Sequence, residues 1–279
     1  MECVFLYVKR SKEALDFAKK VADLVQKEGF KPVSDQEEVD FLPKISPEGL
    51  KSCRLCVVVG GDGTFIAAAR KVAPLGVPIT GINLGTFGFL TEIETVEVKK
   101  LLPKILRGEY KYQERLIFEV YTEREGERKF IDYAVNDAVI SKAALSRMID
   151  ISIDTSLGHL GTVSGDGIIV ATPTGSTAYA LAAGGPIVYP TLEAKVLVPI
   201  CPHTLTQRPI VLGGEVNLSL SVKTEYSTVY LTVDGQIGKT LKPNEKVLIK
   251  KAPFKLKVYP HPYRSYFDLL RIKLKWGKR

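Results

Sequence analysis

The stretch Leu55-Cys56-Val57-Val58-Val59-Gly60-Gly61-Asp62-Gly63-Thr64 decides the fold, because an apolar run leads into a glycine-rich turn. A continuous apolar run of this length is typical of a strand that is covered on both faces. The alanines at positions 67, 68 and 69 favour a helix directly after the turn. A buried strand followed at once by a helix is the repeating unit of an α/β domain with a parallel sheet.

The same alternation continues on both sides of this stretch. Residues 4–8 predict a strand, and residues 12–28 predict a helix with Ser11 as its N-cap and Gly29 at its end. The polar, proline-bearing residues 32–49 predict a mobile loop. Residues 77–82 predict a third strand, followed by a helical stretch that Pro103 interrupts and that ends near Gly108.

The pattern changes after Lys111, where apolar and polar residues begin to alternate. Residues 116–120, 218–222 and 229–233 have the period of strands with one buried face. Glu125-Gly126 and Asp234-Gly235 are typical of tight turns between antiparallel strands. We therefore expect three parts: an α/β domain over residues 1–111, a mostly antiparallel β domain over residues 112–258, and a C-terminal segment over residues 259–279.

The C-terminal segment mixes aromatic residues with Leu269, Leu270, Ile272 and Leu274, and we expect residues 259–276 to pack as a helix. Left unpacked, it would expose a sizeable apolar surface. We expect it to return to the first domain.

Composition and charge limit the classes of protein to which the chain can belong. The chain has 279 residues, 45% of them hydrophobic and 25% charged, as in soluble globular proteins. It has no run of about 18 apolar residues, and its first residues lack the positive head of a signal peptide. We therefore predict a cytoplasmic protein that does not bind membranes. The net charge of +8 is compatible with nucleic acid or small anionic substrates, but no nucleic-acid motif is present.

Cys53 and Cys56 form the only closely spaced pair among the four cysteines. A zinc site needs a second such pair, which Cys3 and Cys201 do not supply. Because Cys56 leads into an apolar strand, we interpret the pair as core thiols rather than as a redox or metal site.

Four polar segments are candidates for chemistry. The turn Gly60–Thr64 can bring backbone N–H groups and a helix N-terminus to a phosphate. A carboxylate there suits a proton acceptor or a metal ligand, and the alternative is an N-cap role for Asp62. Asn136-Asp137 ends an apolar stretch and can bind paired hydroxyls, or can simply form a turn. Residues 83–90 are glycine-rich, and they can form either a simple turn or a functional loop. Residues 164–186 are rich in glycines and hydroxyls, so we expect this loop to present hydroxyls and N–H groups to a nucleotide; the alternative is close helix packing by its small residues.

These segments together resemble the NAD kinases. Gly60–Thr64 matches their GGDGT motif, which diacylglycerol kinases and phosphofructokinases share, and residues 83–90 resemble the N-x-G-x-x-GFL segment. Residues 172–186 resemble the far more specific TPTGSTAY…GGP segment. Residues 199–205 and 208–211 resemble the PxxPHTL and RPIV segments. The resemblance covers nearly the whole chain. It also implies that the C-terminal segment packs on the first domain, as it does in NAD kinases.

The resemblance implies phosphoryl transfer from ATP to the 2′-hydroxyl of the adenosine ribose of NAD, which gives NADP. It implies that Asp62 accepts the proton of that hydroxyl, that Gly63 lies against the NAD, and that Asp166 lies near the nicotinamide. It further implies nucleotide contacts from Asn136, Asp137, Arg147, Thr177, Ala178, Tyr179, Ala180, Leu181, Ala182 and Gln236. Ser164 departs from the pattern, because many NAD kinases have Arg at that position.

The resemblance also implies a divalent cation, Mg²⁺, on the donor phosphates, and a homodimer or homotetramer. Mg²⁺ often keeps waters and binds mainly substrate phosphates, so the sequence assigns it no protein ligands. A lipid kinase would share only Gly60–Thr64, and a phosphofructokinase would need sugar-phosphate arginines that are not found. A regulatory NAD-binding module would have no use for Asp62.

Overall fold

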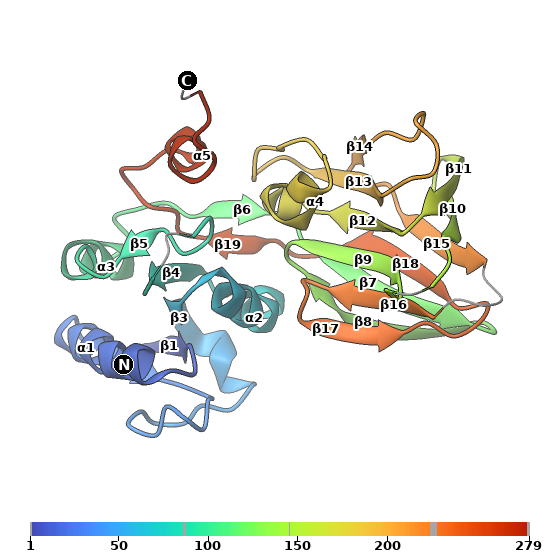
Figure 1. Cartoon of the computed structure of the whole chain (residues 1–279). Helices are drawn as coiled ribbons and strands as arrows, with labels where there is room; N and C mark the ends of the chain where they lie inside the picture. Colours follow the sequence, from blue (N-terminus) through green and yellow to red (C-terminus); the bar gives the residue numbers. More distant parts are fainter. Residues whose placement is uncertain (1, 86–87, 145, 224–227, 278–279) are drawn as a thin grey trace. The chain divides into compact units, whose positions relative to one another are not determined.

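The computed structural model describes residues 2–85, 88–144, 146–223 and 228–277. The chain divides into two compact units (Figure 1). We call the first the N-terminal unit, formed by Met1–Glu114 together with Lys255–Arg279, and the second the β unit, formed by Arg115–Phe254.

The N-terminal unit is built on a seven-stranded sheet in the order β2-β1-β3-β4-β19-β6, with β5 also paired to β4. The pairings of β1 with β2 and β3, and of β4 with β3, β5 and β19, are parallel. The strands are β1 (Cys3–Val8), β2 (Lys31–Val33), β3 (Cys53–Gly60), β4 (Ile79–Asn83), β5 (Ile93–Glu94), β6 (Gln113–Arg115) and β19 (Leu256–Val258). The order and direction place the carboxyl ends of β3, β4 and β5 at one edge of the sheet.

Helices α1 (Lys12–Lys27), α2 (Asp62–Val72), α3 (Val98–Leu106) and α5 (Tyr266–Leu274) accompany this sheet. Two short 3₁₀ turns, Gly49–Ser52 and Ala73–Leu75, complete its regular structure. The apolar stripe of α1 and the buried face of α3 enclose one core with alternate side chains of β1 and β3. Ser11 caps α1 as expected: its hydroxyl accepts the N–H of Ala14.

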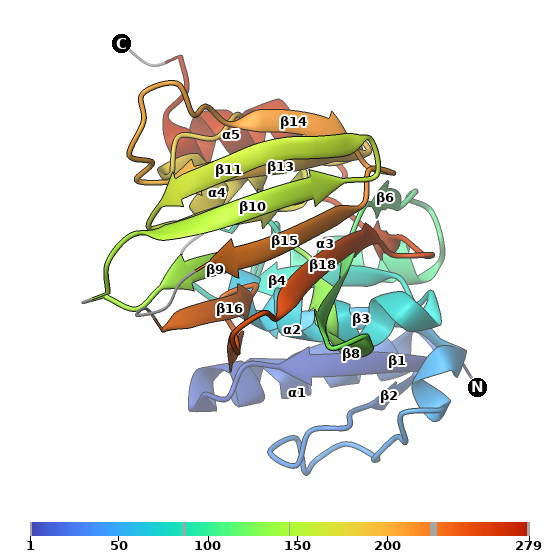
Figure 2. The same ribbon diagram turned by 90° about the vertical axis from the view of Figure 1, so that its right-hand side faces the viewer.

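The β unit consists of two six-stranded sheets, in the orders β11-β10-β15-β18-β7-β8 and β14-β13-β12-β9-β16-β17. Figure 2 looks onto the first of them. Every pairing within these sheets is antiparallel. The first sheet contains β7 (Phe118–Arg124), β8 (Glu127–Ala134), β10 (Ile149–Thr155), β11 (Gly158–Gly165), β15 (Leu218–Lys223) and β18 (Lys246–Lys251). The second contains β9 (Asp137–Lys142), β12 (Gly167–Ala171), β13 (Ala194–Ile200), β14 (Ile210–Gly213), β16 (Val229–Val233) and β17 (Ile237–Thr240).

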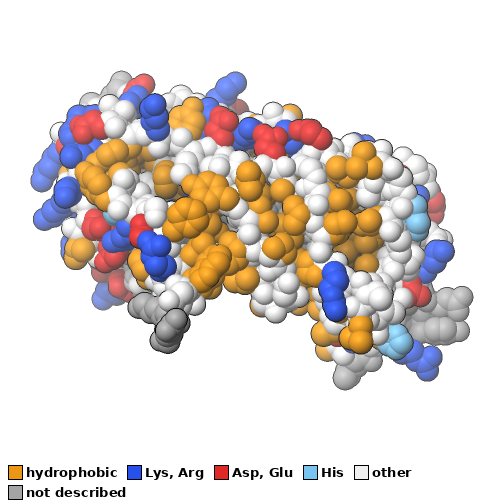
Figure 3. Space-filling model, turned by 90° about the horizontal axis from the view of Figure 1, so that it is seen from above, with side chains coloured by type: hydrophobic (Ala, Val, Ile, Leu, Met, Phe, Trp, Pro, Cys, Tyr) orange, Lys and Arg blue, Asp and Glu red, His pale blue; other side chains and the backbone are white. Residues whose placement is uncertain are grey.

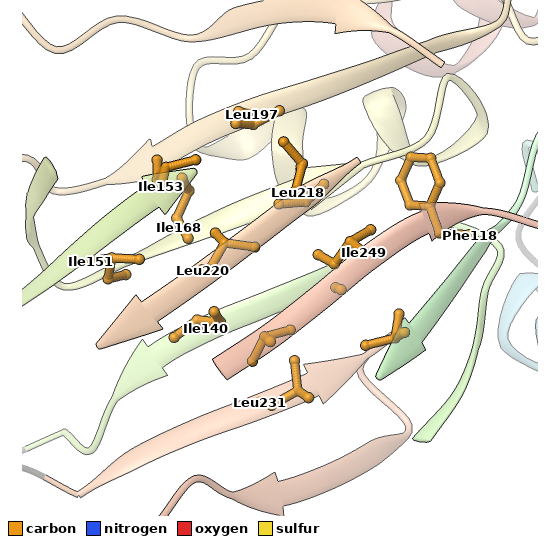
Figure 4. Packing of buried hydrophobic residues seen from close by; sticks show 14 of the residues in the cluster. Phe118, Ile140, Ile151, Ile153, Ile168, Leu197, Leu218, Leu220, Leu231 and Ile249 are labelled. Carbon is orange, nitrogen blue, oxygen red and sulfur yellow. The ribbon is translucent and has the colours of Figure 1, made fainter. Parts of the chain in front are cut away.

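The core of the β unit lies between its two sheets. Figure 4 shows Ile153, Leu220 and Ile249 of the first sheet facing Ile140 and Leu231 of the second. Apolar and polar residues alternate along these strands, so that one face of each sheet is buried. The antiparallel β structure expected after Lys111 is thereby confirmed.

Both predicted turns are present. Glu125 and Gly126 have φ of 54° and 82°, and they join β7 to β8. Asp234 and Gly235 have φ of 52° and 62° after β16. This left-handed conformation matches the twist of the flanking strands.

The C-terminal segment returns to the N-terminal unit, as expected. Strand β19 runs parallel to β4, and the N–H of Tyr259 donates to the carbonyl of Ile79 at 2.9 Å. The expected helix over residues 259–276 is too long, because α5 covers only Tyr266–Leu274. Pro260 and Pro262 disfavour helical backbone before it, and Ser265 begins the helix in a capping box with Asp268.

Two other local expectations need correction. Pro103 does not interrupt α3, which continues to Leu106. Leu101, Leu102, Ile105 and Leu106 are buried, and their packing offsets the hydrogen bond that proline cannot donate. Residues 32–49 are not all loop, since Lys31–Val33 pairs with β1.

Cys53 and Cys56 behave as core thiols, as expected. Cys53 and Cys56 lie on β3, both are buried, and all four cysteines are free. The sulfur of Cys53 lies 2.7 Å from that of Cys3 on the neighbouring strand. Burial raises the pKa of the Cys53 thiol and of the Cys56 thiol, which favours the protonated, unreactive form.

Within the described residues, no helix combines the length and the apolar character needed to cross a bilayer.

Candidate functional site

Asp62 is the first residue of α2, directly after the carboxyl end of β3. The N-cap position belongs to Gly61, and no side chain caps the helix. The N-cap interpretation of Asp62 is therefore wrong, and its carboxylate is directed elsewhere. Gly60 is needed for the turn, because a Cβ there would lie 2.7 Å from the hydroxyl oxygen of Thr64.

Four donors from the loop between β4 and β5 hold the Asp62 carboxylate. Its Oδ2 accepts the N–H of Phe89 at 2.8 Å. Its Oδ1 accepts the N–H of Leu90 at 3.1 Å and both the N–H and the hydroxyl of Thr91 at 3.0 Å. Hydrogen bonds to a charged acceptor are the stronger class, so this loop fixes the orientation of the carboxylate.

Gly88 allows the loop to approach Asp62 this closely. A Cβ on Gly88 would lie 2.0 Å from Oδ1 of Asp62, which excludes any side chain in this geometry. The segment over residues 83–90, which the sequence left open between a turn and a functional loop, therefore surrounds the carboxylate. Thr86 and Phe87 of this segment lie outside the described residues.

A depression of about 430 Å³ opens at the carboxyl ends of β4 and β5. It is lined by Glu13, Asn83, Leu84, Gly85, Glu94 and Thr95. Asn83 is only 5% exposed, and its side-chain oxygen accepts the N–H of Gly85 at 2.6 Å. Ligands of open α/β sheets bind at this edge, so the depression is a candidate part of a nucleotide site.

In the β unit, Asn136 directly precedes β9 and Asp137 begins it, and the backbone of both residues contacts the carboxylate of Asp234. Asp234 accepts the N–H of Asn136 at 2.7 Å, and those of Val135 and Asp137 at 3.1 Å. Asp234 thus organises the backbone of the predicted dipeptide, a role that its place in an Asp-Gly turn did not reveal.

Asp137 has an unusual protonation equilibrium. Its side chain is 5% exposed, and burial, together with the nearby carboxylate of Asp234, raises the pKa of Asp137 to about 7. Below that pH its carboxyl group carries a proton that it can donate in a hydrogen bond.

This raised pKa predicts how stability depends on pH. The folded chain keeps a proton on Asp137 where the unfolded chain has already lost it, so stability falls as pH rises from about 4 to 7. We expect Asp137→Asn to remove a fall of roughly 2–4 kcal/mol in the free energy of unfolding over that range. Urea unfolding of both proteins at each pH measures this difference. Parallel curves would show that Asp137 titrates normally.

The segment of residues 172–178 packs directly against Asn136. The N–H of Thr172 donates to the carbonyl of Asn136 at 2.8 Å, and its hydroxyl donates to the carbonyl of Val135 at 2.6 Å. Ser176 is fully buried and bonds to Pro173 and Val188. These two hydroxyls therefore hold the loop together, contrary to the expectation that they face a ligand.

Other atoms of this segment are better placed to meet a ligand. The buried hydroxyl of Thr174 has no hydrogen-bond partner within the described part of the chain. After the 3₁₀ turn Thr174–Thr177, the four-residue helix α4 (Tyr179–Ala182) leaves Tyr179 and Ala182 exposed and Thr177, Ala178 and Leu181 partly exposed. Ala180 is completely buried and serves packing.

The remaining predicted site residues lie near the surface of their units. Asp166 joins β11 to β12, and its carboxylate is 3.5 Å from the ammonium of Lys142. Arg147, Gln236 and, in the N-terminal unit, Gly63 are exposed. The structure thus brings together Asn136, Asp137 and residues 172–178 in one unit, and Asp62 with residues 88–91 in the other.

The described residues contain no group of three or more His, Cys, Asp or Glu side chains arranged to hold a metal ion.

Comparison with known sequences agrees with both halves of this arrangement. Residues 4–110 match the model of the ATP-NAD kinase N-terminal domain, and residues 135–261 match that of the ATP-NAD kinase C-terminal domain. The NAD kinase of Aquifex aeolicus is 41% identical over 277 residues, 99% of this chain and 100% of the relative. The NAD kinase of Geobacter sulfurreducens is 45% identical over 225 residues, 81% of this chain and 79% of the relative.

Two solved structures share the fold. An NAD kinase from Archaeoglobus fulgidus in complex with ATP has a TM-score of 0.77 at 25% identity, and the match covers 99% of both chains. Yeast NADH kinase complexed with NADH has a TM-score of 0.91 at 21% identity, covering 100% of this chain and 89% of that one.

Proposed function

The chain belongs to the NAD kinase family, and from that premise we propose the part that each site residue plays. It is an enzyme that transfers a phosphoryl group from ATP to the 2′-hydroxyl of the adenosine ribose of NAD, giving NADP. The observation that carries the assignment of roles is the carboxylate of Asp62, held by four donors at the start of a helix.

Asp62 is the proton acceptor of this reaction. As the ribose oxygen bonds to the γ-phosphorus and the bond to the ADP oxygen breaks, Asp62 takes the proton of the 2′-hydroxyl. Oδ1 already accepts three hydrogen bonds, whereas Oδ2 accepts one within the described residues. Oδ2 therefore has the lone pair that can receive the proton. Gly63, the next residue, has no side chain to obstruct the nucleotide.

The β unit supplies the NAD contacts. Asn136 and Asp137 bind nucleotide hydroxyls, and the Asp234 carboxylate that fixes their backbone supports this role. Residues 177–182 line the adenosine, with the exposed ring of Tyr179 available for stacking. Asp166 lies toward the nicotinamide, and Arg147 and Gln236 add polar contacts. Ser164 cannot replace the arginine of other NAD kinases, because its hydroxyl donates to Asp150.

Mg²⁺ bound to the ATP phosphates would neutralise charge on the transferred group. The described residues fit an ion held mainly by substrate oxygens, since they offer no cluster of three His, Cys, Asp or Glu ligands. No protein ligand is assigned. The cytoplasmic location expected from the sequence remains a prediction.

An NADP-production assay tests the function. ATP and then polyphosphate are supplied as donor, each with and without Mg²⁺, and NADP is measured with an NADP-specific dehydrogenase. We expect NADP from ATP only when Mg²⁺ is present. Binding of NAD without any NADP formation would support a regulatory module instead.

The enzyme is a homo-oligomer that assembles through the β unit. Leu157, Leu160, Leu205 and Val211 of this unit are 79%, 41%, 85% and 49% exposed. They lie on or near β11 and β14, the edge strands on one side of the two sheets. Figure 3 shows apolar side chains exposed on the surface of the molecule. Exposed apolar edges of this kind are usually covered by a second copy.

Sedimentation at several concentrations, run beside specific activity, tests the assembly. We expect a dimer or tetramer whose activity falls on dilution, because a site shared between subunits is dismantled by dissociation. A protein that is monomeric at every concentration and fully active would contradict both statements. A dimer whose specific activity does not change when dilution dissociates it would contradict only the shared site.

A further inference from the structure

The orientation of Asp62 depends on three consecutive residues. Phe89, Leu90 and Thr91 direct their N–H groups at its carboxylate, and the hydroxyl of Thr91 adds a fourth donor. A change in the path of this short segment would therefore move the carboxylate. What holds the segment in place consequently matters for any reaction at Asp62.

On one side, short strand pairing holds it. Strand β5, which begins two residues after Thr91, has two residues, and they pair with Ile82 and Asn83 of β4. So brief a ladder contributes little stability by itself.

On the other side, the C-terminal segment binds the residue next to Thr91. Glu92 is 3% exposed, and its carboxylate accepts the N–H of His261 at 2.9 Å. Its backbone carbonyl accepts the guanidinium of Arg264, also at 2.9 Å. Both donors come from residues that lie about 170 positions further along the chain.

Arg264 also binds two acidic residues that follow Glu92 in the chain. Its second terminal nitrogen donates to Glu94 at 2.7 Å and to Glu97 at 3.0 Å, and its side chain is 20% exposed. Three carboxylates within six residues repel one another, and the guanidinium lies among them. Arg264 therefore both neutralises this acidic stretch and ties its backbone down. The guanidinium presents donors in a fixed fork, which lysine cannot reproduce.

Helix α5 also reaches the other end of the segment. The ammonium of Lys273 lies 5.9 Å from the ring centroid of Phe89, the residue whose N–H binds Oδ2 of Asp62. The C-terminal segment therefore contacts Phe89 and Glu92, the residues on either side of Leu90 and Thr91.

We infer that Arg264 is a positioning residue for phosphoryl transfer, acting on Asp62 through Glu92 and Thr91. This inference rests on the proposed role of Asp62 as proton acceptor. It gives the returning C-terminal segment a part in the reaction, although the described side chains of that segment do not touch Asp62.

Steady-state kinetics of Arg264→Gln test the inference. A misplacement of about 1 Å can lower a rate by about 10²-fold, so we expect kcat to fall by roughly 10–100-fold. The KM for ATP should change much less. Arg264→Lys keeps the charge without the fork and should recover part of the loss. Arg271→Gln is the matched control, because Arg271 is exposed on α5 and pairs with Asp268 of its own helix; its kcat should equal that of the wild type.

Double variants test the route. If Arg264 acts through Thr91, the loss of kcat in Arg264→Gln with Thr91→Val should be smaller than the product of the single losses. In an Asp62→Asn background, measured with excess enzyme, Arg264→Gln should cause no further loss.

Three results would overturn the inference: an unchanged kcat in Arg264→Gln, full multiplication with Thr91→Val, or an equal further loss in the Asp62→Asn background. Should Arg264→Gln not fold, an Arg264→Lys enzyme with wild-type kcat would overturn it equally. High activity of Asp62→Asn alone would instead refute the proposed role of Asp62.

Discussion

Asp62→Asn is expected to lower kcat by roughly 10²–10⁴-fold, the usual cost of losing a positioned base. The amide cannot accept the proton of the ribose hydroxyl at this position. Its NH₂ group would face either the N–H of Phe89 or the N–H groups of Leu90 and Thr91. In either orientation a hydrogen-bond donor would face another donor with no acceptor between them. The loop is therefore expected to shift slightly in this variant, while the rest of the unit keeps its structure.

Three measurements separate loss of chemistry from loss of structure. Turnover is measured with saturating ATP and NAD, the fold by thermal unfolding, and NAD affinity by calorimetry. We expect a large loss of turnover with NAD affinity close to that of the wild type. Asp16→Asn, an exposed carboxylate on α1 paired with Lys19, is the control and should be fully active. More than half of the wild-type kcat in Asp62→Asn would mean that another group takes the proton.

The fold could be predicted largely because its patterns are local. The buried run before Gly60, the stripe of α1 and the alternation in residues 218–222 each follow from neighbouring side chains. The two helix predictions that failed have different causes: packing overrides a local preference in α3, whereas local proline sterics restrict the start of α5. Pro103 should end a helix, but the buried face of α3 stabilises it, and the prolines before Ser265 shorten α5.

The candidate site was predictable only where a motif marked it. Asp62 and Asn136 stand in segments that the sequence marks as candidates for chemistry, whereas Thr91 stands in none and Asp234 is marked only as part of a turn. Thr91 contacts Asp62 across 29 positions, and Asp234 contacts Asn136 across 98. Such contacts depend on which strands become neighbours in the sheet. Local patterns in a single sequence do not reveal that order.

Glycines illustrate the same limit. Gly88 and Gly175 belong to the two halves of the predicted site, and Gly175 does not have the positive φ that would explain a glycine in a turn. Their reason is space, since each lies against a residue of the predicted site, Asp62 for the first and Asn136 for the second. The site is thus built by close approach of backbone segments, for which the sequence gives only the small residue as a signal.

Gly175→Ala is expected to damage both stability and NAD binding. Gly175 is buried, and a Cβ there would lie 2.1 Å from the carbonyl oxygen of Asn136 and 2.6 Å from its Cα. Both atoms belong to the backbone, so no side-chain rotation relieves the clash. Overpacking of this kind typically costs about 1–3 kcal/mol, and more where backbone must move. For a unit of this size that corresponds to a fall in Tm of roughly 2–12 °C.

The clash should displace Asn136, the residues around Gly175, or both, because hydrogen bonds join the two sides of this contact. Gly175 donates its N–H to the hydroxyl of Thr172, and that hydroxyl in turn donates to Val135. We therefore expect NAD affinity to fall at least about tenfold, as when a buried hydrogen-bonding group loses its place. Gly238→Ala is the matched control, since a Cβ on Gly238 meets nothing within 4 Å and its φ is not positive. Calorimetric titration with NAD and thermal unfolding of both variants measure the effect. A Gly175→Ala enzyme with wild-type Tm and NAD affinity would show that residues 172–178 can withdraw from Asn136, and the proposed role of that contact in binding NAD would then be wrong.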